Sequence, residues 1–368
     1  MVKLGKNHPF IQLTKGPACC RPPMVPLAPS HSITPSSNII VGTYYDGSFE
    51  HPPLIPKGFI WYPTDTTPKS FPPPSASNQI YTYYIPQSAS KDGNTIIGIC
   101  GNNKITIDMG LVFSGYIFNY TLTTNSFIYY YPPEYVEPLP FNLFNPQIIS
   151  HDGSTIFGYI SSNDGLNFKL NSDFKSNLIN LNNTPYNIPK TYTTSVSKDG
   201  TISVGNNRDT TKGYMLNGEI VTYPVSFTDM SGSYITSITS DGKTYVGVCV
   251  DDNRDYLYAF KNDTKISSIT NVSFNVIGSF NILISPDGST VVWIDDTNSF
   301  FKQINDNTPI KINTPEFIDT NISLSSISED GGIISGNLFI SLVGIKSFRI
   351  IGNKFDILDK PSVTQGSS

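Results

Sequence analysis

The chain is short of charge, of alanine and of basic runs, and each shortage excludes a class of protein. Charged side chains make up 14 % of the 368 residues, and the formal net charge is −5. No long run of Lys or Arg is present to neutralise a phosphate backbone, so we expect no nucleic-acid partner. Alanine, the best helix former, occurs at only five positions, whereas aromatic residues make up 12 % of the chain. This composition predicts an all-β protein.

Cysteines and long apolar runs are also scarce. The four cysteines, Cys19, Cys20, Cys100 and Cys249, are too few and too scattered for a disulfide framework. No apolar run is long enough to cross a bilayer, so we expect no membrane span. The N-terminal residues lack the continuous apolar segment of a secretory signal, which favours an intracellular or virion-associated protein.

What the sequence does contain is a repeat built around Asp-Gly. Six Asp-Gly pairs stand in register, each with a Ser or Thr two residues before the aspartate, and in five of the six a glycine follows six residues after it. Trp293 takes the place of that glycine in the remaining unit. A seventh, degenerate unit carries Ser36-Ser37 where Asp-Gly is expected, ahead of Gly42. The turn positions are 42 to 60 residues apart, and such spacing is typical of solenoids, propellers and arrays.

We interpret the Asp-Gly pairs as structural turns. Glycine tolerates a positive φ, and an aspartate side chain can accept a hydrogen bond from the backbone that follows it. The predicted turn residues are Asp92, Gly93, Asp152, Gly153, Asp199, Gly200, Asp241, Gly242, Asp287, Gly288, Asp330 and Gly331. The later glycine of each unit is expected either to allow a close approach of neighbouring units or to mark a β-bulge.

Every unit has the same order of segments: a strand ending at the Ser or Thr, the turn, a β-branched strand, a polar loop, an aromatic strand and a last strand. The aromatic strands are residues 58–62, 115–118, 166–169, 213–216, 256–260, 299–302 and 346–350. Four strands per unit predict an all-β, seven-bladed β-propeller of four-stranded antiparallel blades, with an extended N-terminal arm.

The domain boundaries follow from where the repeat begins and ends. We predict a Pro-rich N-terminal arm at residues 1–30, the propeller at 31–359 and a C-terminal tail at 360–368. Because the first and last units each hold four strands of their own, ring closure is expected to rest on packing. The apolar run at residues 10–13 could instead add to an outer edge or close the ring.

The unit resembles two repeat families of β-propellers. One is the Ser-Pro-Asp-Gly repeat of Tol-type propellers, and the closer one is the HAF repeat, with its Ser-x-Asp-Gly turn and its small-aromatic-hydrophobic-Trp strand. Gly58-Phe59-Ile60-Trp61 and Tyr258-Ala259-Phe260 carry the latter resemblance, although the His that precedes Ala-Phe in that family is missing. The resemblance covers about residues 31 to 358 and implies the propeller fold. No catalytic residue carries over from it.

Residues that could carry chemistry stand apart from one another. The histidines, His8, His31, His51 and His151, have no short spacing between them, so no metal site is predicted. Oxygen-rich loops at residues 206–209, 251–255 and 295–296 could hold calcium, but the twelve-residue calcium loop is missing and solvated turns are the favoured interpretation. The chain has no Gly-x-Ser-x-Gly elbow and no phosphate-binding glycine loop. We therefore predict no catalytic residue and no cofactor, and enzymatic activity has no support.

Tyrosine-rich tracts are the most distinctive surface candidates. Tyr83, Tyr84, Tyr129, Tyr130 and Tyr131 lie near proline runs in the longer, early units. Tyrosine supplies a large contact area at low entropic cost, which makes these five a candidate interface. Each tract could equally be an ordinary strand, since alternation does not place its side chains inside or outside.

The function that these observations favour is non-enzymatic. They predict a propeller that serves as a protein-interaction or assembly scaffold in a large particle such as a virion. The abundance of Ile, Asn, Lys and Tyr is typical of AT-rich genomes, including those of large DNA viruses. The alternative is a glycan-binding or carbohydrate-active propeller, which would need aromatic platforms and carboxylates on one face.

Overall fold

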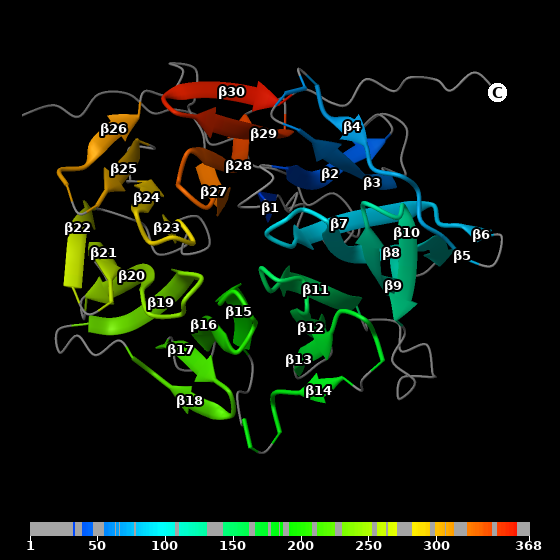
Figure 1. Ribbon diagram of the computed structural model, residues 1–368, viewed down its shortest axis with the longest axis horizontal. Coiled ribbons are helices and arrows are strands. Elements are labelled where there is room, and N and C mark those ends of the chain that lie inside the picture. The colour runs from blue at the N-terminus through cyan, green and yellow to red at the C-terminus, as the bar shows by residue number, and fades with distance from the viewer. Residues whose placement is uncertain are drawn as a thin grey trace, which may run out of the picture.

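The regular elements of the chain are strands, arranged as seven blades around a central axis (Figure 1). The computed structural model describes residues 32–33, 39–46, 55–62, 64–65, 67–76, 79–106, 110–130, 143–161, 166–175, 178–183, 185–186, 191–207, 212–224, 230–251, 256–262, 264–270, 282–294, 299–305, 307–312, 322–340 and 344–358. Each blade is a four-stranded antiparallel sheet. The predicted seven-bladed fold is confirmed, and the degenerate first unit forms a blade of its own. Within these residues, no helix could cross a bilayer.

The strands follow one another through the blades in chain order. Blade 1 holds β1 (Ser32–Ile33), β2 (Ile40–Asp46), β3 (Ile55–Trp61) and β4 (Lys69–Ser70); blade 2 holds β7 (Tyr83–Ala89), β8 (Thr95–Thr106), β9 (Gly110–Thr121) and β10 (Ser126–Tyr130). Blade 3 holds β11 (Leu143–Ile149), β12 (Thr155–Ser161), β13 (Leu166–Asn171) and β14 (Ile179–Asn180); blade 4 holds β15 (Thr191–Val196), β16 (Ile202–Asn207), β17 (Lys212–Asn217) and β18 (Ile220–Thr222). Blade 5 holds β19 (Met230–Ile238), β20 (Tyr245–Asp251), β21 (Tyr256–Lys261) and β22 (Thr264–Thr270). Blade 6 holds β23 (Leu283–Ile284), β24 (Thr290–Ile294), β25 (Phe300–Ile304) and β26 (Ile310–Ile312), and blade 7 holds β27 (Ile322–Ile327), β28 (Ile333–Ile340), β29 (Gly344–Ile351) and β30 (Lys354–Leu358). A small hairpin of β5 (Ser75–Ala76) and β6 (Gln79–Ile80) stands between blades 1 and 2 in the sequence.

The later glycine of the repeat faces an aromatic ring in its own blade. Gly98 pairs with Phe118 across the second and third strands of blade 2, and Gly336 pairs with Phe348 in blade 7. A Cβ on either glycine would collide with a carbonyl oxygen of the first strand and with the ring. The first strand has a bulge directly beside the glycine, for example between Pro86 and Ser88. The glycine therefore marks a bulge, and the close approach occurs within the blade.

Blade 6, where the repeat lacks this glycine, fills the position with a ring. Trp293 pairs with Phe301 on the neighbouring strand, and the two rings stack with centroids 5.7 Å apart and planes 13° apart. Trp293 is buried in the apolar cluster between blades 5 and 6. An aromatic pair thus replaces the combination of glycine and aromatic ring that the other blades use.

The core is divided into apolar clusters that lie between neighbouring blades. Blades 2 and 3, for instance, share a cluster that contains Ile97, Ile117, Ile156 and Phe168. Equivalent clusters join blades 1 and 2, 3 and 4, 4 and 5, 5 and 6, and 6 and 7. Burial of these side chains between sheets holds the ring together.

Among the described residues, blade 1 and blade 7 meet through packed side chains. Each has four strands of its own, and none of the described strands is shared between the two blades. Their buried apolar cluster contains Ile40, Phe59, Trp61 and Ile333. The guanidinium carbon of Arg349 lies 3.1 Å from the centroid of the Trp61 ring across the same junction. This arrangement agrees with closure by packing, and the alternative role of residues 10–13 lies outside the described residues.

The antiparallel order gives the propeller two distinct faces. Connections from first to second strand and from third to fourth strand lie on one face, which we call the turn face because it carries the Asp-Gly turns. Connections from second to third strand and from one blade to the next lie on the other face, which we call the loop face. The proposed division into arm, propeller and tail stays a prediction, since residues 1–31 and 359–368 lie outside the described part of the chain.

Candidate functional site

The six Asp-Gly turns share one hydrogen-bonding geometry. In blade 4 the backbone N–H of Gly200 donates to the carbonyl oxygen of Ser197, closing a β-turn, and Gly200 has a φ of 69°. The Ser197 hydroxyl donates to Oδ1 of Asp199 at 2.9 Å, and the Thr201 backbone N–H donates to the same oxygen at 3.0 Å. The other five turns repeat these contacts, with Gly φ values between 68° and 79°.

Hydrogen bonds to the turn carboxylates favour their charged form. The backbone N–H of Thr201 lowers the pKa of Asp199, and the backbone N–H of Gly332 lowers the pKa of Asp330. The Asp-Gly turns thus hold charged aspartates around the turn face. Because one oxygen of each carboxylate is occupied by the turn itself, these residues act as structural anchors.

A belt of backbone hydrogen bonds runs from blade to blade through the residue between Ser and Asp, which we call position x. The N–H of Lys91 donates to the carbonyl of His151 at 2.8 Å, and the N–H of Lys198 donates to that of Ser240 at 2.8 Å. The backbone N–H of Ser240 donates in turn to the carbonyl of Pro286 at 2.8 Å. Pro286 has no N–H, and the following residue, Asp287, donates to Glu329 at 3.3 Å instead. A corresponding hydrogen bond, from the backbone N–H of Asp152 to the carbonyl of Lys198 at 2.9 Å, completes the belt from blade 2 to blade 7.

Hydroxyl groups connect the innermost strands around the axis. The Thr194 hydroxyl donates to the carbonyl of Ile235 in the next blade at 2.8 Å, and the Thr236 hydroxyl donates to Ile282. In the opposite sense, the backbone N–H of Ile149 donates to the Ser88 hydroxyl at 3.3 Å. These side chains satisfy backbone groups that an inner edge strand would otherwise leave unpaired.

The inner strands enclose an axial cavity of about 100 Å³ near the turn face. Its wall combines hydroxyl side chains with apolar ones, among them Ser88, Ser195, Ser237 and Ile284, and His151 and Pro286 stand at its turn-face end. The cavity therefore ends at the ring of x residues. The contacts of the side chains at position x therefore decide whether the cavity is open on the turn face.

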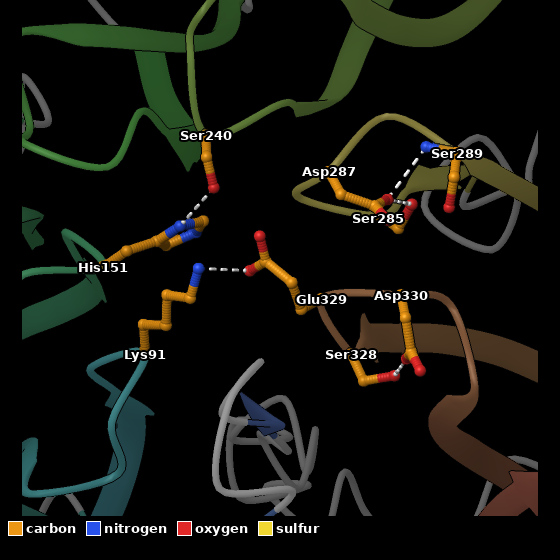
Figure 2. A network of polar contacts seen from close by, with 9 residues as sticks. All are labelled: Lys91, His151, Ser240, Ser285, Asp287, Ser289, Ser328, Glu329 and Asp330. Carbon is orange, nitrogen blue, oxygen red and sulfur yellow. Dashed lines mark hydrogen bonds and ion pairs between the residues drawn. The ribbon is translucent and has the colours of Figure 1, made fainter.

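Two contacts between side chains span the turn-face end of the axial cavity, which we call its mouth. Figure 2 shows them: Nδ1 of His151 lies 2.9 Å from the Ser240 hydroxyl, and Nζ of Lys91 lies 2.9 Å from Oε2 of Glu329. The four residues come from blades 3, 5, 2 and 7 respectively, so each bridge crosses between blades that are not neighbours.

His151 is neutral at neutral pH. Burial lowers its pKa, and the charges of Lys91 and Lys198 act in the same direction, whereas Glu329 and Asp152 oppose them. A neutral imidazole can either donate or accept at Nδ1, and the Ser240 hydroxyl can complement either tautomer. The bridge consequently persists without a charge on His151.

The contact between serine and histidine has the length that a nucleophile and its general base require, but not their surroundings. Within the described residues, Nε2 of His151 has no carboxylate bonded to it that would orient the ring. The backbone N–H of Ser240, a natural oxyanion donor, is already bonded to Pro286. The arrangement is suited to joining blades rather than to nucleophilic catalysis.

Most of the tyrosines singled out from the sequence lie in the protein interior. Tyr83, Tyr84 and Tyr130 are 1 %, 5 % and 9 % exposed, and they pack in or beside the cores that blade 2 shares with its neighbours. Tyr129 is half-buried, and its hydroxyl donates to the carbonyl of Ser75 at 2.9 Å. Tyr131 lies outside the described residues. The structure brings Tyr84 and Tyr129 to one cluster, with only Tyr129 near the surface.

Sequence reasoning did not single out Tyr116, the residue through which this cluster reaches the surface. Its ring is 38 % exposed and lies 5.5 Å from that of Tyr81 and 6.4 Å from that of Tyr129. Tyr81 and Tyr129 are themselves 5.6 Å apart, so the three rings form a triangle. Burial raises the pKa of Tyr81 to about 12, and its hydroxyl stays protonated.

The remaining sequence candidates are placed less completely. Of the histidines, only His151 is described, and the residues described contain no group of three or more His, Cys, Asp or Glu side chains able to hold a metal ion. The loops at residues 208–209, 252–255 and 295–296 lie outside the described part. The mouth residues were not predicted as a group. The sequence feature that could have identified them is position x, where the residue type and charge vary from unit to unit while the flanking Ser or Thr and Asp-Gly stay the same.

Comparison with solved structures shows the same fold. The β-propeller domain, of open velcro topology, of the trilobed protease from Pyrococcus furiosus superposes with a TM-score of 0.54 at 8 % identity, over 91 % of this chain and 98 % of that one. An oligogalacturonate lyase in complex with manganese superposes with a TM-score of 0.56 at 10 % identity, over 90 % of this chain and 89 % of that one. A chain of the mitotic checkpoint complex gives 0.52 at 10 % identity, over 95 % and 98 %. At such identities the likeness concerns the fold alone.

No family model and no curated protein matches the sequence. The resemblance to HAF and Tol-type repeats therefore stays a prediction about the repeat, whereas the propeller that it implied is observed.

Proposed function

We propose that the protein is a non-enzymatic propeller scaffold that binds protein partners through its loop face, as a structural component of a large assembly such as a virion. The observation that supports this most is where the topology gathers the irregular parts of the chain. The long connections from β4 to β7 and from β10 to β11 start and end on the loop face. The chain also enters β1 and leaves β30 on that face.

The two faces differ in how far their polar groups are already used. On the turn face, the Asp-Gly turns and the belt satisfy backbone groups within the ring. The loop face instead receives the insertions that distinguish this chain from a plain repeat, and recognition residues are commonly carried on loops held by a rigid scaffold. Protein partners, without a cofactor or nucleic acid, are consistent with this division.

The proposal is tested by comparing variants that alter one face only. We expect deletion of residues 1–30, which precede the loop-face entry into β1, to reduce incorporation into the complex isolated from the native source. A matched turn-face variant, Lys198→Glu with Lys243→Glu, changes two exposed charges and is expected to incorporate normally. Incorporation is measured as the fraction of tagged protein that co-sediments with the complex. Loss in the turn-face variant alone would contradict the proposal.

A glycan-binding function is the second candidate, and Tyr116 is the observation that favours it. Sugar rings stack on exposed aromatic faces, and the triangle of Tyr81, Tyr116 and Tyr129 offers one. A glycan array with the intact protein tests this directly. If the function is correct, Tyr116→Ala abolishes the signal while Tyr223→Ala, at another exposed tyrosine, leaves it unchanged. The absence of any glycan signal from the intact protein excludes it.

A further inference from the structure

The belt of backbone hydrogen bonds, as far as it is described, runs from blade 2 to blade 7. Blade 1 has Ser36-Ser37 in place of Asp-Gly, and residues 34–38 lie outside the described part of the chain. The two ends of this described belt, Lys91 in blade 2 and Glu329 in blade 7, belong to the two blades on either side of blade 1.

Counted over the described residues, the apolar cluster between blades 7 and 1 is also the smallest of the seven. The cluster between blades 7 and 1 contains four described residues, with Ile333 as the single contribution of blade 7. Between blades 1 and 2 the cluster is much larger and includes the rings of Phe71, Tyr84 and Phe118. Blade 1 is therefore held firmly by blade 2, and the seam of the ring lies between blade 1 and blade 7.

We propose that the ion pair of Lys91 and Glu329 is a clasp that helps to close the ring at this seam by joining blade 2 to blade 7. Lys91 stands at position x of blade 2 and Glu329 at position x of blade 7, the two ends of the belt. Their charged atoms meet at 2.9 Å and so connect blade 2 to blade 7 (Figure 2). With 31 % and 29 % of their side chains exposed, both groups are largely shielded from water, which strengthens an ion pair.

A second contact of a charged side chain, at the seam itself, supports the idea that charged side chains help to hold the ring closed. The Arg349 guanidinium of blade 7 covers the Trp61 ring of blade 1, and its Nε lies 3.2 Å from the carboxylate of Asp356. Arginine stacked on tryptophan is a favourable cation–π contact. Trp61 is itself fixed by a 3.0 Å hydrogen bond from its indole N–H to the carbonyl of Asp65.

The experiment is hydrogen–deuterium exchange on the full chain, followed separately in each blade. Lys91→Met and Glu329→Gln remove the charges of the clasp, and the double variant Lys91→Glu with Glu329→Lys restores the pair with reversed charges. We expect exchange at the seam, in β2 and β27, to rise at least fivefold in the single variants and to return toward the original rate in the double variant. Exchange in blades 3 to 5 stays unchanged. Lys243→Met is the matched control, since its ammonium lies 3.8 Å from Asp241 within a single turn.

Salt provides a second measurement on the unaltered protein, which covers the case of a variant that fails to fold. High ionic strength weakens the pair, so exchange at β2 and β27 should rise with salt while that of the inner blades does not. The proposal is overturned if seam exchange is insensitive to both charge removal and salt, if all blades respond equally, or if the reversed pair restores nothing.

Discussion

Gly200 and Gly288 have the same backbone geometry but different neighbours. Their φ values are 69° and 79°, a region that β-branched residues enter only at a cost of roughly 1–2 kcal/mol. A Cβ on Gly200 would also lie 2.7 Å from Cβ of Thr155, whereas on Gly288 the nearest atom, in Thr239, is 3.3 Å away. Gly218 has a φ of 59° with no atom within 4 Å of such a Cβ.

These differences predict a ranking of three valine variants. Gly218→Val should lower the free energy of unfolding by about 1 kcal/mol through backbone strain alone. Gly288→Val should cost somewhat more, and Gly200→Val about 3 kcal/mol, because strain and collision add. Chemical denaturation of the three purified variants measures the order. Equal midpoints for Gly200→Val and Gly218→Val would show that the blades move apart without cost.

His151 makes the stability of the ring depend on pH. Burial holds its pKa in the folded state below the value of about 6.5 that an exposed histidine has. As pH falls below that value, the unfolded chain binds a proton before the folded one does, so the free energy of unfolding decreases until pH passes the folded pKa. His151→Gln removes this titrating group, so the free energy of unfolding should depend less on pH.

The comparison needs only two conditions for each protein. Denaturation midpoints are measured at about pH 7 and about pH 5, on either side of the unfolded histidine pKa. The original protein should lose more stability between them than the glutamine variant does. Parallel losses in the two proteins would mean that other groups cause the change.

At the scale of strands, the pairing of a glycine with an aromatic ring determines how each blade is built. In blade 5, Gly247 pairs with Phe260, and a Cβ there would collide with the carbonyl oxygen of Tyr234 and with the ring. We therefore predict that Gly247→Ala destabilises the fold by about 2–3 kcal/mol, even though alanine is the smallest possible addition. Gly218→Ala, in open space, is the control. A similar thermal midpoint for both variants would mean that the bulge relaxes.

The strands could be predicted because their signals are local. A β-branched segment after Asp-Gly and an aromatic segment after a polar loop recur in each unit, and the third strand of each blade contains or overlaps the aromatic segment. The role of the later glycine could be narrowed only to two possibilities. The choice between them depends on Phe118 and its equivalents, which lie on another strand and whose ring positions no sequence pattern gives.

For the whole molecule, the separate four-stranded blades predict that the arm is not needed for folding. The first described strand begins at Ser32, so deletion of residues 1–30 removes none of the described strands. We expect the deleted protein to melt within a few degrees of the full chain, in a cooperative transition. Circular dichroism and calorimetry measure this. A large loss of stability would show that the arm supplies buried contacts to the ring.

The side-chain contacts at the mouth of the axial cavity could not be predicted from the sequence. Lys91, His151, Ser240 and Glu329 stand in four different blades, and their spacing along the chain carries no motif. They meet only because the ring brings position x of several blades to the axis. The tyrosine tracts show the converse, since strand alternation predicted neither the burial of Tyr83 nor the exposure of Tyr116.

Blades built from consecutive residues also set the order in which the protein can form during its synthesis. Each sheet is complete as soon as its own stretch of chain has left the ribosome, and most of its contacts are short-range in sequence. Blade 2 can dock on blade 1, and each later blade on the one before it, without waiting for the C-terminus. The one step that must wait is the meeting of blade 7 with blade 1, so an unfinished chain is an open arc with an exposed apolar edge at its growing end.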